Sequence, residues 1–126
     1  MNAAEEVVRR LHRTLLDTRD PEAVDGLFAP GFRSHNLPPG LPPGVEGVKS
    51  WFATMRDTFP DVDVRIDQVV ADGDAAAIAT TFVATHAPTG RRVSVTGIDM
   101  IRVEDGLIVE HRGLTDTVGL MRQLSD

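Results

Sequence analysis

The sequence contains no cysteine and no tyrosine, and its 126 residues include one tryptophan and five phenylalanines. The absence of cysteine excludes disulfides, thiol catalysis and metal binding by thiolates. Positive charge is also scarce, because 13 Lys and Arg stand against 19 Asp and Glu and give a formal net charge of −6. This balance disfavours nonspecific binding to nucleic acid or to an anionic membrane surface.

Long apolar segments and several well-known motifs are missing as well. No run of about 18 apolar residues is present, and the start, MNAAEEVVRR, lacks the cationic and then apolar order of a signal peptide. We therefore expect a soluble, cytoplasmic protein. The sequence has no Walker loop, GxGxxG or GxSxG motif, and its four histidines include no HExxH pair. Phosphate binding, nucleophilic serine chemistry and a local metal site thus have no support from motifs.

The residues that are present predict one domain spanning residues 1–126, because a hydrophobic content of 41% at this length can form a sizeable core. Apolar residues at helical spacing predict helices over residues 3–18 and 45–59. A cap followed by proline predicts a short helix over residues 20–27. The segment 36–44, NLPPGLPPG, is expected to be a loop, and it could act as a flap.

The period of the sequence then changes from that of a helix to that of a strand. Alternating apolar and charged residues predict a strand over 62–71, and segments rich in Thr, Val and Ile predict two more over 75–86 and 91–103. A hairpin around the dipeptide DG, within residues 97–116, supplies a fourth strand. Helices followed by antiparallel strands predict an α+β fold, with the helices against one face of a curved antiparallel sheet.

The hairpin is rich in titratable residues, and its register decides which of them share a face. A regular two-residue turn would place Asp99 opposite Arg112, with Asp116 on the same face. A bulge would instead put His111 opposite Asp99 and move Asp116 away, because a shift of one residue reverses every side chain. The sequence leaves both registers open.

Several segments, taken in order, resemble the SnoaL-like polyketide cyclase family of the NTF2-like superfamily. They are FRSHNLPPG at residues 32–40, FPD at 59–61, GIDMIR at 97–102 and the pattern DGLIVEH…D…QL between residues 105 and 124. The resemblance covers nearly the whole chain. It implies a cone in which the curved sheet wraps around N-terminal helices, a homodimer packed through the sheet, and no metal or cofactor.

The resemblance also implies an activity. Characterised cyclases of the family close a ring by intramolecular aldol condensation, with an acid/base aspartate that matches Asp116. In the more distant ketosteroid isomerases a similar strand carries a protonated aspartate, which would correspond to Asp99. The absence of tyrosine removes the phenolic donor of those isomerases and disfavours their reaction. An aldol closure needs only a positioned base and a hydrogen-bond donor, so no cofactor is expected.

We expect the catalytic residues to be Asp116, Asp99 and His35, meeting in one cavity. Each also has a structural interpretation. Asp116 could cap the short helical turn expected at the end of the chain, TVGLMRQL at residues 117–124. Asp99 could form an ion pair with a nearby arginine, and His35 could make a hydrogen bond at the rim. The expected substrate-binding residues are Asn36, Trp51, Phe52, Met55, Phe59, His111 and Arg112. The apolar members of this set could equally belong to the core.

The expected partners are a small, hydrophobic, polyketide-like substrate and a second copy of the chain, with no nucleic acid and no membrane. A sheet face with apolar and small polar side chains is expected to form the dimer. It comprises Thr80, Phe82, Ala84, Ser94, Thr96, Ile98 and Met100. Two alternatives stay open: an epoxide-opening hydrolase or hydroxylase on the same scaffold, and a noncatalytic dimeric module that binds a small ligand.

Overall fold

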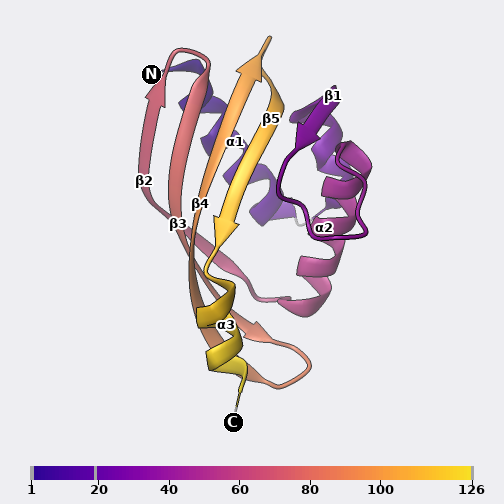
Figure 1. Ribbon diagram of the computed structural model, residues 1–126, viewed down its shortest axis with the longest axis vertical. Coiled ribbons are helices and arrows are strands. Elements are labelled where there is room, and N and C mark those ends of the chain that lie inside the picture. The colour runs from indigo at the N-terminus through magenta and orange to yellow at the C-terminus, as the bar shows by residue number, and fades with distance from the viewer. Residues whose placement is uncertain (1, 19, 126) are drawn as a thin grey trace.

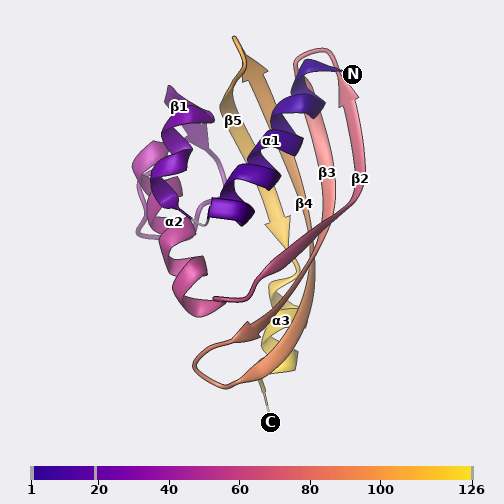
Figure 2. The same ribbon diagram turned by 180° about the vertical axis from the view of Figure 1, so that it is seen from behind.

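The computed structural model describes the backbone of residues 2–18 and 20–125 and the side chains of residues 2–14 and 20–125. It has the predicted α+β architecture, in which helices lie against one face of a curved sheet (Figure 1). Seen from behind, helix α1 crosses in front of the sheet (Figure 2). No helix in the described part of the chain is long and apolar enough to cross a membrane.

The helices begin and end where the sequence predicts. α1 (Ala3–Thr18) starts after Asn2, whose Oδ1 accepts hydrogen bonds from the first turn. The predicted short helix is a 3₁₀ helix, η1 (Pro21–Gly26), which is capped by the side chain of Asp20. α2 (Val45–Thr58) ends just before the proline that follows it. The buried side chains of α1 and α2 include Ala4, Val7, Val8 and Val48.

The sheet has five strands in the order β1-β5-β4-β3-β2, and a last helix, α3 (Thr117–Leu124), follows it in the chain. β1 runs parallel to β5, whereas the other neighbours are antiparallel. β1 was not expected, because its central proline and glycine hide the strand pattern; an edge position tolerates such a proline. The strands are β1 (Phe28–Ser34), β2 (Asp63–Asp72), β3 (Ala75–His86), β4 (Arg91–Glu104) and β5 (Leu107–Thr115).

The two faces of the sheet differ sharply in burial. On β4, Val93, Val95 and Ile101 are buried and define the inner face, which the helices cover, whereas Ile98 and Met100 are exposed and define the outer face. The core lies on the inner face in two clusters. The main cluster includes Phe32, Ile78, Ile101, Val103 and Ile108, and the second consists of Phe59, Ala84, Val93 and Val95.

The pairing of β3 with β4 corrects one expectation. Ala84 pairs with Val93 and Thr80 pairs with Gly97, so even-numbered residues of β3 share the inner face with odd-numbered residues of β4. The predicted dimer face, which grouped even-numbered residues of both strands, is therefore wrong for Thr80, Phe82 and Ala84. Ala84 is fully buried. The members on β4 do lie together on the outer face.

The hairpin between β4 and β5 has the expected two-residue turn, with φ of 51° at Asp105 and 78° at Gly106. After the turn, however, a bulge in β5 shifts the register. Asp99 consequently pairs with Gly113, and its predicted position opposite Arg112 is wrong. The bulge brings His111 to the face of Asp99, as the bulged alternative predicted, because one extra residue reverses the faces of the side chains beyond it. The predicted pairing of His111 directly with Asp99 is wrong, since His111 pairs with Ile101.

Candidate functional site

Three polar side chains from three strands form a hydrogen-bonded chain on the inner face, which we call the inner triad: Ser34, His111 and Asp99. Ser34 Oγ lies 3.0 Å from His111 Nδ1, and His111 Nε2 lies 2.8 Å from Asp99 Oδ1. The parallel pairing of β1 with β5 sets Ser34 beside His111. The bulge in β5 then brings His111 to the face that carries Asp99.

Exposure increases along the inner triad in one direction. Ser34 is 8% exposed, the side chain of His111 is 25% exposed and that of Asp99 is 41% exposed. In a serine hydrolase the order is reversed, because the hydroxyl meets the substrate and the carboxylate is buried behind the histidine. The inner triad therefore presents a carboxylate to solvent, with an imidazole and a hydroxyl behind it.

Two residues that sequence reasoning did not single out help to form this arrangement. A Cβ at Gly113 would lie 2.1 Å from Asp99 Oδ1, so the bare backbone leaves room for the carboxylate. Asn36, which was predicted to bind substrate, accepts a hydrogen bond from the N–H of Gly113 through Oδ1 at 3.0 Å. Ser34 is the other missed residue. The sequence signal for both was weak, since Gly113 required knowing the bulge in β5 and Ser34 required knowing that β1 pairs with β5.

The proline-rich loop holds the end of β1 in place. The N–H of Ser34 donates to the carbonyl of Pro43 at 2.8 Å, and the N–H of Asn36 donates to Ser34 Oγ at 3.3 Å. The loop in turn packs tightly on the start of α2, where a Cβ at Gly47 would lie 1.8 Å from the carbonyl oxygen of Pro42. The segment predicted as a flap thus contacts the residues that support the inner triad.

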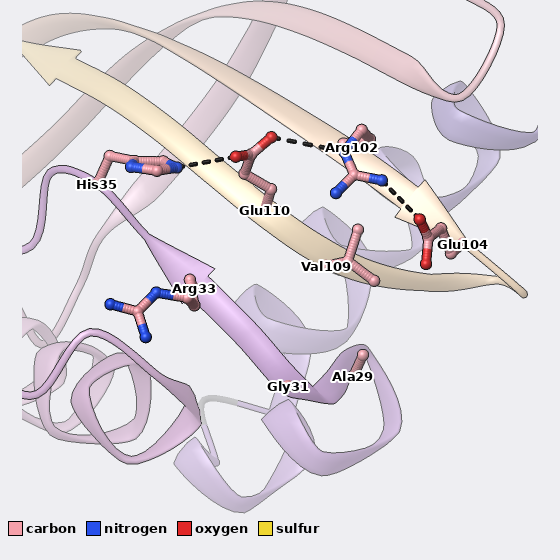
Figure 3. Close-up of a pocket in the computed structure, with 8 residues that line it drawn as sticks. All are labelled: Ala29, Gly31, Arg33, His35, Arg102, Glu104, Val109 and Glu110. Atoms are coloured by element: carbon pink, nitrogen blue, oxygen red, sulfur yellow. Dashed lines mark hydrogen bonds and ion pairs between the residues drawn. The ribbon is translucent and has the colours of Figure 1, made fainter.

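His35 lies on the opposite face from its neighbour Ser34, because successive side chains of a strand alternate. Its Nε2 is 2.9 Å from Glu110 Oε2, and Arg102 contacts Glu110 and Glu104 at 3.5 Å and 2.6 Å (Figure 3). The hydrogen bonds from His35 and then from Arg102 hold the pKa of Glu110 below its usual value. The expected convergence of His35 with Asp99 in one cavity is therefore wrong.

These outer-face side chains border a pocket of about 460 Å³. Its lining residues are Ala29, Gly31, Arg33, His35, Arg102, Glu104, Val109 and Glu110 (Figure 3). Arg112, predicted to bind substrate, is exposed on the same outer face, opposite Met100. Neither in this pocket nor elsewhere among the described side chains, those of residues 2–14 and 20–125, do three or more His, Asp or Glu side chains form a group that could hold a metal ion.

Asp116 is the N-cap of α3. Its Oδ1 accepts a hydrogen bond from the N–H of Gly119 at 2.9 Å, and a Cβ at Gly119 would lie 2.2 Å from Asp116 Oδ2. The structural interpretation of Asp116 is thus observed, while its catalytic role stays a prediction. The preceding residue, Thr115, pairs with Gly97. Gly97 is two positions from Asp99, a separation of roughly 7 Å along the strand.

The predicted apolar wall belongs largely to the core. Phe59 is buried in the second cluster and packs edge to face on Phe82, with ring centroids 5.0 Å apart. Phe52 and Met55 are partly buried against the main and the second cluster. Trp51 is half-buried on α2. The helical spacing of these residues therefore reflects packing, and Phe59 in particular is a core residue.

Comparisons with known proteins agree with the fold and the sequence pattern. A sequence model described as SnoaL-like polyketide cyclase matches residues 6–124. The structure is similar to that of TsrD from Streptomyces laurentii, with a TM-score of 0.86 and 28% identity over 98% of this chain and 95% of that one. It is also similar to that of wild-type IdmH from Streptomyces antibioticus, with a TM-score of 0.83 and 29% identity over 96% of this chain and 97% of that one.

A more distant similarity is to AclR from Streptomyces galilaeus, which is provisionally described as a hydroxylase. The TM-score is 0.80 at 21% identity, over 96% of this chain and 83% of that one. At this identity the similarity shows a common fold. Among curated proteins, none matches the chain.

Proposed function

The chain belongs to the SnoaL-like polyketide cyclase family, and on that premise we propose that it closes a ring by an intramolecular aldol reaction, with Asp99 as the acid/base group. The substrate is a small, hydrophobic, carbonyl-rich molecule of the polyketide class. One observation carries the proposal: the inner triad ends in a carboxylate that is partly exposed and hydrogen-bonded from behind by His111.

The proposed reaction needs only proton transfers. Asp99 removes a proton from a carbon next to a carbonyl, and the electron pair of that C–H bond forms an enolate. The enolate carbon attacks a second carbonyl of the same molecule, forming the new C–C bond and an alkoxide. Asp99 then returns its proton to the alkoxide, so the product is an isomer of the substrate. A positioned acid/base of this kind typically accelerates a reaction by roughly 10²–10⁴-fold.

His111 and Ser34 support Asp99 without entering the reaction. The hydrogen bond between His111 Nε2 and Asp99 Oδ1 fixes one oxygen of the carboxylate, which leaves the other oxygen for the substrate proton. The buried Ser34 hydroxyl in turn contacts the far side of the imidazole. Because orientation of the reacting groups lowers the entropy cost of the transition state, a fixed carboxylate favours the reaction.

Asp116 is the second candidate for the acid/base role. The family resemblance supports it, and it lies one residue beyond the pair Thr115 and Gly97, directly after the strand next to that of Asp99. Against it stands its cap hydrogen bond to Gly119. That hydrogen bond ties the Asp116 carboxylate to the first turn of α3 and accounts for the residue by a structural role. We therefore place the proton transfers on Asp99.

The proposed assembly is a homodimer packed through the outer face of the sheet. Val70, Ile98, Met100 and Leu114 are each more than half exposed there, and we call them the outer apolar patch. Val70 and Met100 both flank Ala77, and Ile98 pairs with Leu114, so the patch is continuous across β2 to β5. Contiguous exposed apolar surface of this kind is typical of protein interfaces.

The proposal is tested by deuterium exchange on a panel of candidate substrates. The exchange detects formation of the enolate even when a compound of the panel does not cyclise. Carbonyl-rich aromatic polyketides are incubated with the protein in D2O, and deuterium at the α-carbon is measured by NMR and mass spectrometry. We expect exchange with the wild-type protein and its loss in Asp99→Asn. Exchange that persists in Asp99→Asn would remove Asp99 from the mechanism.

The same experiment separates cyclisation from the other reactions of the scaffold. An aldol closure leaves the mass of the substrate unchanged, whereas opening of an epoxide by water adds one molecule of water and hydroxylation adds one oxygen atom. A product that carries ¹⁸O from labelled water would favour the epoxide-opening hydrolase, whereas a product one oxygen heavier that carries ¹⁸O only from labelled O2 would favour the hydroxylase. Binding of a panel compound with neither exchange nor turnover would favour a noncatalytic binding module.

A further inference from the structure

We propose that Ser34 is a positioning residue that holds the neutral imidazole of His111 as the Nε2–H tautomer, so that His111 donates to Asp99. The link to catalysis rests on the proposed function, whereas the tautomer itself does not. The contacts that carry the proposal are the 3.0 Å approach of Ser34 Oγ to His111 Nδ1 and the 2.8 Å approach of His111 Nε2 to Asp99 Oδ1.

The contacts of Ser34 leave its hydroxyl proton for His111. The N–H of Asn36 donates to Ser34 Oγ at 3.3 Å, so one lone pair of the hydroxyl is occupied. A hydroxyl has one donor and two acceptor sites. The donor is free to point at His111 Nδ1, and an imidazole nitrogen that accepts a hydrogen bond carries no proton. The proton of the neutral ring is then on Nε2.

The contact at the other nitrogen selects the same tautomer. A carboxylate oxygen is an acceptor, so His111 Nε2 must carry the hydrogen of the 2.8 Å contact to Asp99. With the opposite tautomer, two lone pairs would face each other across this distance. Ser34 and Asp99 therefore act together on one ring. If the proton moved to Nδ1, Asp99 would lose its donor, and the nearly buried Ser34 hydroxyl would have to accept from Nδ1–H and give up Nδ1 as the acceptor for its own hydrogen.

The charged neighbours of His111 in β5, and His35 after β1, lie on the other side of the sheet. Glu110 and Arg112, the neighbours of His111 in β5, point to the outer face because side chains of a strand alternate. His35 lies on that face as well, where it contacts Glu110. From β4, the charged side chain that contacts the ring is Asp99. Ser34 is also held firmly, since its N–H donates to Pro43 and it is nearly buried. The hydroxyl is thus a fixed partner of Nδ1.

The consequence for the reaction concerns where the substrate proton goes. Because His111 Nε2 already carries a hydrogen, it has no lone pair with which to take a proton from Asp99. The proton that Asp99 removes from substrate stays on the carboxylate, ready to be returned to the alkoxide. Without Ser34, the ring can adopt the Nδ1–H form and turn a lone pair towards Asp99, which diverts that proton.

Nitrogen NMR of protein labelled with ¹⁵N in its histidine rings tests the proposal without any substrate. The signals of His111 are identified by their loss in His111→Asn, and the ratio of the two tautomers is measured at a pH where the ring is neutral. In the wild-type protein we expect a protonated Nε2 and an unprotonated Nδ1. In Ser34→Ala the ratio of Nε2–H to Nδ1–H should fall about fivefold, the effect of losing one ordinary hydrogen bond.

Two further variants make the result specific. Ser34→Thr keeps the hydroxyl and should restore the wild-type ratio. Ser94→Ala removes an exposed hydroxyl from the outer face of β4 and should change nothing. Thermal melting monitors folding in each case. A wild-type signal showing Nδ1–H, or an unchanged ratio in a folded Ser34→Ala, would overturn the proposal, and the first result decides even if Ser34→Ala does not fold.

The outcome is independent of the proposed reaction. If the tautomer depends on Ser34 but Asp99→Asn retains full turnover, the proposed function fails while the positioning role of Ser34 stands. If Asp99→Asn is inactive but the tautomer does not respond to Ser34→Ala, the proposed function stands and this inference fails.

Discussion

Gly113 on β5 lies directly against the carboxylate of Asp99 on β4, its partner in the strand pairing. A Cβ at position 113 would stand 2.1 Å from Asp99 Oδ1 and 2.8 Å from His111 Nε2. Both distances are far shorter than a van der Waals contact. The missing side chain of Gly113 is therefore what allows His111 to reach Asp99 across the hairpin.

We expect Gly113→Ala to displace the carboxylate of Asp99 and to break its hydrogen bond with His111. Cyclisation, or α-carbon exchange in its place, should fall by roughly 10²-fold, the lower end of what a positioned acid/base contributes. The free energy of unfolding should change by no more than about 1 kcal/mol, because the clash involves a partly exposed side chain. Rate measurements and urea denaturation of the same preparations check both parts.

A second glycine provides the matched control for this prediction. A Cβ at Gly31, on β1, would meet no atom within 4 Å. Gly31→Ala should therefore leave both activity and stability close to those of the wild-type protein. Full activity in Gly113→Ala would show that the contact of His111 with Asp99 is not needed for the reaction.

The proposed dimer predicts that a charge in the outer apolar patch produces monomers. Met100→Glu places a carboxylate within the patch, opposite the exposed Arg112, and burying this pair against the apolar patch of a second copy would still be costly. Light scattering at micromolar concentration should give a dimer mass for the wild-type protein and a monomer mass for the variant. Met121→Glu, on exposed α3, serves as the control and should stay dimeric. A monomeric wild-type protein would refute the proposed assembly.

The helices and four antiparallel strands were predictable because their residues repeat with clear periods. The stripe that includes Val7 and Val8 identifies α1, and the pair Asp105 and Gly106 identifies the turn of the hairpin. β1 was missed because Pro30 and Gly31 interrupt its pattern, and an edge strand needs no regular alternation. Its parallel pairing with β5 depends on contacts between segments that are distant in the sequence.

The candidate site was predictable only in part for the same reason. Asp99 and His111 were recognised as candidates, but whether they meet depends on a bulge of one residue in β5. No local signal marks that bulge, since the residues around it suit a regular strand equally well. The missing β1 also concealed Ser34, and it made His35 look like a neighbour of Asp99 when strand alternation separates them.

Acid denaturation should depend on Asp61, which lies just after α2. Hydrogen bonds from the backbone N–H and the hydroxyl of Thr85, and the charge of Arg92, lower the pKa of Asp61 from its usual 3.8. A carboxylate whose pKa is lower in the folded than in the unfolded state stabilises the fold at any pH above its unfolded-state pKa. This contribution disappears as the pH falls through the pKa of the folded state. Asp61→Asn should therefore be less stable than wild type at neutral pH.

The sign of this effect gives it a distinctive pH profile. The gap in urea midpoint between Asp61→Asn and the wild-type protein should narrow as the pH falls below the unfolded pKa of Asp61 and close once the pH is below its lowered folded pKa, where Asp61 is protonated in both states. Asp105→Asn, in the exposed turn, is the control and should follow the wild-type profile. A gap of constant size from neutral to acid pH would mean that shape at position 61, and not charge, is what matters.

The choice between the two candidate carboxylates is decided by a matched pair of variants, Asp99→Asn and Asp116→Asn. An asparagine at 99 keeps the shape of the side chain but cannot take a proton, so turnover should fall by roughly 10²-fold or more. An asparagine at 116 can still cap α3 through the N–H of Gly119, so the free energy of unfolding should change by less than about 1 kcal/mol and turnover should persist. Rates are compared at saturating substrate, with melting curves to confirm folding. The reverse result, an active Asp99→Asn and an inactive but folded Asp116→Asn, would assign the base to Asp116 and leave the inner triad with a structural role.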